Sequence, residues 1–150
     1  MIRENIYAAL FAYFSGLTDG INPLFNKATR RLSIWESVEP EDQPALLQLQ
    51  RRETVTKTKG LPAKWSLTVD LYLYVHTGAT NDPDVVPSQL LNPLMDAIEQ
   101  AIVIDDVMTD SCTLGGLVYR CFIDGPVEIF EGNLGDQAVC IIPITIVVPT

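Results

Sequence analysis

The stretch "KWSLTVDLYLYVHT", residues 64–77, decides the fold. Six apolar side chains alternate with more polar ones, which is the two-residue period of a β-strand with one buried face. These six are Trp65, Leu67, Val69, Leu71, Leu73 and Val75. Upstream, "PALLQLQRRETVTKTKGLP", residues 44–62, is rich in Thr and Val near its end and closes on a Gly-Leu-Pro break. The two runs together predict a long antiparallel hairpin.

Two other segments have helical spacing, with apolar residues every three or four positions. The first contains Ile2, Ile6, Leu10, Tyr13, Phe14 and Leu17, and the second contains Leu90, Leu91, Leu94, Met95, Ile98, Ala101 and Ile102. Gly16 and the Asp19-Gly20 pair end the first helix. Pro93 suits a helix only near its start, so we expect Asn92 to cap the regular part of the second. The alternative is a helix from about Ser88 with a kink at Pro93.

Further strands are expected on either side of these elements. Leu32 and Ile34 indicate a short strand around 30–37, and residues 117–123 and 127–130 predict a broken strand with a bend at Gly125-Pro126. Residues 138–148, "AVCIIPITIVV", predict a last strand that is apolar on both faces and must be covered on both. Pro143 cannot donate to a central ladder and belongs at an edge or bulge. Coverage of one face or edge by another subunit would reconcile the two demands.

The order of these elements predicts an α+β fold. We expect an antiparallel or mixed sheet of about four to five strands, two helices packed on one face, and a long β-hairpin arm. The chain has 150 residues, a length that fits one domain spanning residues 1–150.

Composition excludes several classes of function. A net charge of -9 argues against a surface built to neutralise DNA phosphates. The N-terminus lacks the features of a signal peptide, and residues 138–148 are fewer than the roughly 20 needed to span a bilayer. Three cysteines without a C-x-x-C pair predict reduced thiols in a protein made in the cytoplasm.

The candidate chemistry favours structural interpretations. Gly115 and Gly116 match neither a P-loop nor a Rossmann loop, and a strand follows them where a phosphate site requires a helix. His76 has no nucleophile tied to it by a local motif. The cysteines lack partners at zinc-ligand spacing. The loop acids do not match an EF-hand and are interpreted as solvated charge; they are Asp82, Asp84, Asp105, Asp106 and Asp110. We predict no catalytic, cofactor or metal site, and no enzymatic activity.

The proposed hairpin carries half of the ten basic residues, namely Arg51, Arg52, Lys57, Lys59 and Lys64. Two interpretations stay open. The charges could protect the edges of a soluble hairpin, or the hairpin could be an arm that docks on an acidic partner or on a neighbouring copy. The apolar Leu61-Pro62 tip is unusual for a purely solvated turn. The candidate assembly contacts are Arg51, Arg52, Lys57, Lys59, Leu61, Lys64 and Pro143.

With these segments in order, the chain resembles the phage tail terminator proteins, also called tail completion or minor tail neck proteins. The likeness lies in the opening helix, "PALLQLQRRETV", "KWSLTVDLYLYVH", "LLNPLMDAIEQAI", "TLGGLVYRCFIDG" and "AVCIIPITIVV". It implies a ring, usually a hexamer, that caps the tail tube, stops its polymerisation and presents a surface to the head connector. The implied partners are other copies of the chain, the major tail tube protein and the head-tail connector protein. DNA would pass through the ring without specific binding, and the protein would reside in the virion neck.

Other functions stay open at this point. A head-tail joining or adaptor protein is similar in size and also forms rings. A non-viral regulatory binding module could use the basic hairpin to hold an acidic protein, and an enzyme would have to use His76 with the loop acids.

Overall fold

The structure is a computed structural model that describes residues 2–79, 83–134 and 136–149. It confirms an α+β fold with two helices and a six-strand, mixed, open sheet. The helices are α1 (Arg3–Ser15) and α2 (Pro87–Ala101). The strands are β1 (Lys27–Thr29), β2 (Ala45–Thr56), β3 (Lys64–His76), β4 (Arg120–Ile123), β5 (Glu128–Leu134) and β6 (Gln137–Pro149). Short 3₁₀ turns span Trp35–Ser37, Pro40–Asp42 and Thr77–Ala79.

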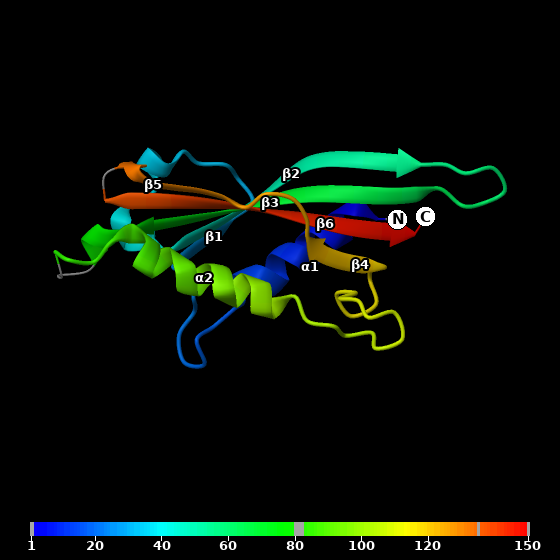
Figure 1. Ribbon diagram of the computed structural model, residues 1–150, viewed down its shortest axis with the longest axis horizontal. Coiled ribbons are helices and arrows are strands. Elements are labelled where there is room, and N and C mark those ends of the chain that lie inside the picture. The colour runs from blue at the N-terminus through cyan, green and yellow to red at the C-terminus, as the bar shows by residue number, and fades with distance from the viewer. Residues whose placement is uncertain (1, 80–82, 135, 150) are drawn as a thin grey trace.

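The strands run along the long axis of the molecule (Figure 1). Their order is β1-β2-β3-β6-β4, and β5 also pairs with β6. The predicted hairpin is confirmed, because β2 and β3 pair in antiparallel register from Ala45 opposite Tyr74 to Thr56 opposite Lys64. β1 pairs with β2 in parallel, which makes the sheet mixed.

Both helices cover the same face of the sheet. The main hydrophobic core joins Ile6, Leu10 and Phe14 of α1 with Leu91 and Ile98 of α2, all at most 2% exposed. The same core contains alternate residues of β3, from Leu67 to Val75, and of β6, from Ala138 to Val148. The apolar side chains that alternate in residues 64–77 therefore lie on the face of the sheet that the helices cover. The hydroxyl of Tyr13 also donates to the carbonyl of Ala101, which links the two helices near their ends.

The opposite face is covered only in part. A second, smaller cluster at the end of the sheet far from the hairpin contains Val38, Ala45, Leu47, Tyr74 and Val139. Along β6, Val147 is also buried on this side. The second apolar face of β6 thus finds much of its cover within the chain, so it gives no independent argument for a second subunit.

Pro143 lies in a central strand, which corrects the expectation of an edge or bulge. β6 pairs with β3 along its whole length, while its other side is shared between β5 (Glu128 opposite Ile141) and β4 (Ile123 opposite Ile144). Pro143 sits at the break between those two neighbours, where its carbonyl accepts a bond of 3.1 Å from the N–H of Asp124. The N–H that proline lacks therefore faces the break, where the ladder needs no donor.

Two sequence predictions about element boundaries are wrong. The strand expected around 30–37 does not form; the short β1 precedes it and pairs with β2 only as far as Leu47, and Leu32 and Ile34 are 56% and 59% exposed, so no buried face holds them in a sheet. Helix α2 begins at Pro87 rather than after Asn92, so the alternative start near Ser88 is the better one. Pro87 occupies the first turn, and the side chain of Gln89 accepts from the N–H of Val86 at 2.9 Å.

Candidate functional site: the projecting hairpin and the adjacent groove

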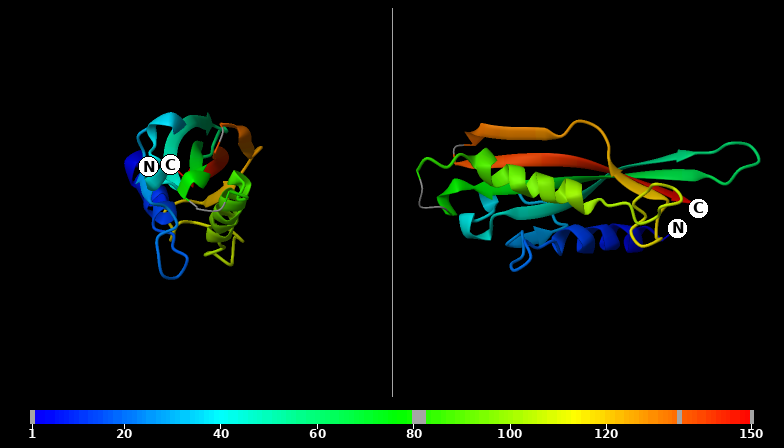
Figure 2. Two further views of the ribbon diagram at one scale, coloured as in Figure 1. Left: turned by 90° about the vertical axis from the view of Figure 1, so that its left-hand side faces the viewer. Right: turned by 60° about the horizontal axis from the view of Figure 1, so that its bottom comes forward.

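The tip of the β2–β3 hairpin projects beyond both helices and the remaining strands (Figure 2, right). Toward the tip, Trp65 is the last side chain of β3 that packs against the main core, where it is partly buried. Residues 57–62, beyond it, are exposed. The turn is ordered locally: the N–H of Leu61 donates to the Thr58 carbonyl at 3.0 Å, and Lys57 Nζ donates to the Leu61 carbonyl at 2.6 Å. Gly60 supplies the positive φ of 83° that the turn requires.

Three of the predicted contact residues form a basic tip. Lys57, Lys59 and Lys64 are exposed, and the sequence from 54 to 64 contains no carboxylate to offset them. The side chain of Leu61 lies among them and is 59% exposed. Val55, which is 50% exposed, adds a second apolar surface nearer the sheet. The tip thus combines positive charge with apolar area, a combination suited to contact with an acidic protein surface.

Arg51 and Arg52 lie at a β-bulge in the base of the hairpin. The register of β2 against β3 shifts between Gln50 and Arg52, which adds one residue and reverses the face of every later side chain. Gln48 accordingly contacts α1, as does Glu53 on the far side of the bulge. Both arginines are exposed, and Arg51 turns toward the face opposite the helices, where its Nη1 lies 3.6 Å from Asp70 Oδ1.

Arg51 and Pro143 line the same groove, which sequence reasoning did not identify. The groove has a volume of about 580 Å³ and lies on the face opposite the helices, beside the connection between β4 and β5 that Figure 1 shows crossing near the middle of the sheet. Its lining residues are Arg51, Thr68, Asp70, Tyr72, Asp124, Gly125, Pro126, Glu128, Ile141, Pro143 and Thr145. Three carboxylates against one guanidinium give it a net negative charge. Two features of the sequence mark the position of this groove. They are Asp70, on the more polar face of β3, and the Gly125-Pro126 bend.

Asp70 is the poorly solvated charge in this groove. Its side chain is only 14% exposed, and its Oδ1 is buried without a hydrogen-bond partner among the described residues. Burial raises the pKa of Asp70, and the nearby charge of Glu128 raises it further, while Arg51 lowers it. At 3.6 Å the Arg51 pair is an ion pair without hydrogen-bond geometry, so burial prevails.

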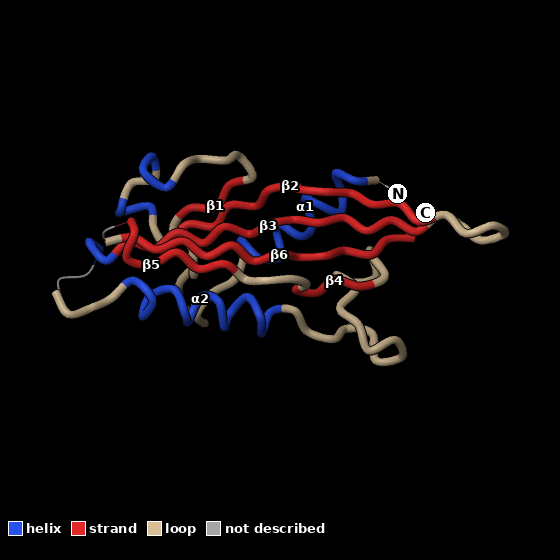
Figure 3. The backbone as a smooth tube through the Cα atoms, turned by 45° about the horizontal axis from the view of Figure 1, so that its top comes forward, coloured by secondary structure: helices blue, strands red, loops and turns tan. Residues whose placement is uncertain are grey.

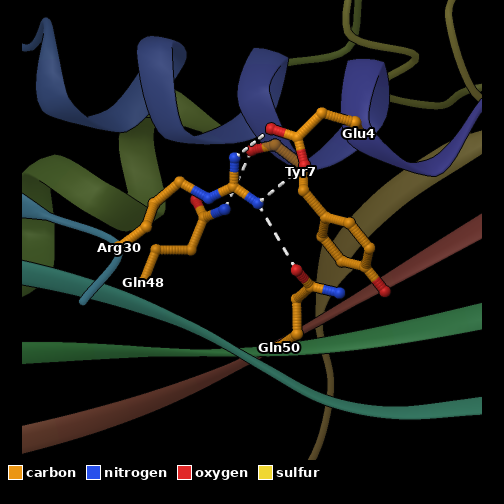
Figure 4. Close-up of polar contacts among 5 residues, drawn as sticks. All are labelled: Glu4, Tyr7, Arg30, Gln48 and Gln50. Atoms are coloured by element: carbon orange, nitrogen blue, oxygen red, sulfur yellow. Dashed lines mark hydrogen bonds and ion pairs between the residues drawn. The ribbon is translucent and has the colours of Figure 1, made fainter. Parts of the chain in front are cut away.

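A separate polar cluster fastens α1 to β2 (Figure 4). Arg30 donates to the carboxylate of Glu4 at 2.5 Å and to Gln50 Oε1 at 3.4 Å. The hydrogen bond from Arg30 lowers the pKa of Glu4. The buried Gln48 amide donates to the Tyr7 carbonyl at 2.9 Å. These bonds join α1, β2 and Arg30 within the chain, which indicates a structural role, although Gln48 Oε1 is buried without a hydrogen-bond partner among the described residues.

Glu53 of β2 accepts hydrogen bonds from two residues of α1, from Arg3 Nε at 2.8 Å and from the Tyr7 hydroxyl at 2.9 Å. The Arg3 bond is the main cause of a lowered Glu53 pKa. Burial, followed by the bond to Glu53, raises the pKa of Tyr7 to about 12. Arg3 also lies over the ring of Trp65, at 4.8 Å from its centroid. These contacts hold the start of α1 against the base of the hairpin.

The Gly115-Gly116 segment is a turn that binds a carboxylate of the protein itself. Both glycines have positive φ, 75° and 94°. Asp105 accepts from the N–H of Thr113 at 2.6 Å, from its hydroxyl at 2.7 Å, and from the N–H of Gly115 at 2.9 Å. These bonds, with that from Gly115 the largest cause, lower the Asp105 pKa. The N–H groups of Thr113 and Gly115 are thus engaged by Asp105, and that of Gly116 donates to Thr113.

The remaining candidates of sequence analysis are dispersed. His76 Nδ1 accepts from the N–H of Gly78 at 2.8 Å at the end of β3. Cys112, Cys121 and Cys140 are all buried as free thiols, and burial raises the pKa of Cys121 and of Cys140 to about 12. Asp82 lies outside the described residues. Within the described ranges, no three His, Cys, Asp or Glu side chains are grouped so that they could hold a metal ion.

No protein-family model matches the chain, and no curated protein matches it either. Among the described helices, none combines the length and the apolar character needed to cross a membrane.

Proposed function

We propose that this protein is a structural assembly protein of a phage or prophage tail, in which copies of the chain form a ring that caps the tail tube. The ring stops polymerisation of the tube and provides the surface that the head connector joins. One observation carries the proposal: a basic arm, with Lys57, Lys59 and Lys64 around its tip, projects from a chain whose net charge is -9. The order of segments that resembles tail terminators supports it.

The arm suits a contact between copies because it is unlike the rest of the molecular surface. When two different patches of identical subunits meet, the contact is heterologous, and it generates a ring if the rotation between neighbours closes. A projecting arm on one side and an acidic surface on another supply such a pair of patches. Two-fold pairing through the arms alone would instead bring like charges together.

The proposed partners are other copies of the chain, the major tail tube protein and the head-tail connector protein. DNA passes through the ring without specific binding. A net negative charge supports this last point, because like charges keep DNA from adhering to the wall of the bore.

The test is the assembly state of the purified protein, alone and with the tube protein encoded in the same phage or prophage genome. Sedimentation gives the mass, and negative-stain electron microscopy shows any ring. We expect rings with a central hole, located at tube ends, and shorter tubes when the protein is present during tube polymerisation. A chain that stays monomeric under both conditions and never binds tube ends overturns the proposal. Binding to the connector but not to the tube would assign it as an adaptor instead.

A further inference from the structure

We infer that the groove beside Asp70 receives the basic hairpin tip of a second copy of this chain. The inference rests on the proposed assembly of copies and goes further, because it assigns the surface that binds the arm. The two surfaces lie on every copy, so the contact joins the arm of one subunit to the sheet face of the next.

Charge complementarity identifies the occupant. The groove presents Asp70, Asp124 and Glu128 against Arg51, while the tip presents three lysines and no carboxylate. Asp70 gains most from a new partner, since its Oδ1 is buried and lacks a hydrogen bond among the described residues. A lysine ammonium carries three donors that could complete it.

Apolar contacts supplement the charges. Ile141 and Pro143 contribute apolar atoms to the wall of the groove. Close by on β5, Phe130 lies on the same face of the sheet as Glu128 and is 43% exposed. The hairpin offers Leu61 at its tip and Val55 along its side. Burial of these surfaces favours association, and the charges fix which surfaces meet.

The arm cannot reach the groove of its own chain. The hairpin continues β2 and β3 in one ladder up to Thr56 opposite Lys64, and the groove lies on the same strands, at Arg51 and from Thr68 to Tyr72. To fold back, the tip would have to break the outer pairs of that ladder, and Figure 3 shows both strands extending away from the sheet centre. The occupant is therefore a second copy.

A competing acidic surface lies at the far end of the sheet, around the 3₁₀ turns. Glu36, Glu39 and Glu41 are exposed there. Exposed carboxylates are already solvated, so a lysine gains little by pairing with them, whereas Asp70 is largely withdrawn from water. This end provides the matched control.

The experiment is disulfide cross-linking between two variants that each add one cysteine and keep every charge. Thr58→Cys labels the hairpin turn and Thr145→Cys labels the groove; for the control, Thr58→Cys is mixed with Ser37→Cys from the acidic end. The native cysteines are buried and do not compete. We expect cross-linked dimers in the first mixture, formed on the order of tenfold faster than in the control and suppressed at 1 M salt. Equal rates in the two mixtures, or no dimer in the first, overturn the inference.

Charge exchange tests the same contact without cysteines. Lys57→Glu with Lys59→Glu should abolish assembly, as should Asp124→Lys with Glu128→Lys, and a mixture of the two double variants should restore a contact between unlike copies. Glu39→Lys with Glu41→Lys, an equal change of charge, should leave assembly intact. Circular dichroism confirms that each variant is folded. Rings of the parent protein that persist without the cross-link overturn the groove contact and leave the proposed function standing, whereas a parent protein that never assembles, alone or with the tube protein, overturns both.

Discussion

Asp70 of β3 lies opposite Pro143 of β6, at the position where the second neighbour of β6 changes from β5 to β4. The chain between those strands leaves the ladder at Gly125, whose φ is 109° and whose Cβ position would lie 3.6 Å from the ring of Pro143. A gap in the ladder, a proline that does not need the missing donor and a largely buried carboxylate therefore occur together. This relationship creates the groove.

Asp70→Asn is expected to increase the free energy of unfolding by about 1 kcal/mol at pH 7, because a poorly paired charge leaves a largely buried site. The folded pKa is raised above the unfolded one. The charged carboxylate thus costs stability at pH values above the folded pKa, and the cost disappears as the pH falls below it. The gain from the amide should accordingly shrink between neutral pH and pH 4. Urea unfolding at several pH values measures this.

The control for Asp70→Asn is Asp124→Asn, which removes an exposed charge from the same groove. Its effect should stay within about 0.5 kcal/mol. Equal effects of the two substitutions would show that the result reflects the overall charge of the groove rather than the burial of Asp70.

Glu53→Gln is expected to decrease the free energy of unfolding by about 1 kcal/mol, since the carboxylate accepts bonds from both Arg3 and Tyr7. The Glu53 pKa is lowered in the folded state. Its contribution is complete above the unfolded pKa, near 4.5, and is lost as the pH falls through the folded value. The difference between variant and parent should vanish in acid. Glu36→Gln, an exposed carboxylate in a 3₁₀ turn, should show neither effect.

The patterns that predicted the fold are those in which one buried face sets a strict period. The alternation from Trp65 to Val75 identified β3, and a period of three to four identified α1, because Leu10 and Phe14 both enter the core. Residues 30–37 misled because Leu32 and Ile34 alternate but remain 56% and 59% exposed. Alternation without a buried surface does not make a strand.

The groove and the bulge could not be predicted, because both depend on which strands become neighbours. The single extra residue at Arg51 changes the face of every later residue in β2, yet nothing in the local sequence marks it. For Pro143 the sequence predicts an edge or a bulge, because it does not show that β4 and β5 share one side of β6. Long-range pairing decides both features.

Pro93→Ala is expected to stabilise the protein by about 1–3 kcal/mol. Pro93 lies inside α2, where it removes the bond to the carbonyl four residues earlier, and its side chain is exposed, so little packing is lost. Pro87→Ala is the matched control, because at the start of the helix no N–H bond is missing and the effect should be close to zero. Thermal unfolding of both variants decides; equal changes would mean that Pro93 does not strain α2.

Gly115→Ala is expected to destabilise the protein by about 1–2 kcal/mol, the cost of a left-handed backbone for a residue with a side chain. An added Cβ would meet no atom within 4 Å, so the cost lies in the backbone and not in a clash. Gly115→Asn should cost less, because asparagine visits this region more readily. Chemical denaturation ranks the two variants, and an alanine variant as stable as the parent would contradict the turn assignment.

Leu61→Ser is expected to weaken self-association about tenfold while leaving the unfolding midpoint unchanged. Leu61 is 59% exposed at the hairpin tip and supports no core, so a polar replacement affects only surfaces that meet another molecule. A tenfold change corresponds to about 1.4 kcal/mol, within the range of one apolar side chain buried on association. Sedimentation equilibrium measures the constant.

The matched control is Ile21→Ser, which removes an apolar residue that is 89% exposed in the loop after α1, away from the hairpin. Its association constant should equal that of the parent. If both variants weaken association alike, apolar exposure in general drives self-association and the hairpin has no special part. If neither variant weakens association, the tip binds through its lysines alone. Leu61 then contributes only to the turn, where its carbonyl accepts a hydrogen bond from Lys57.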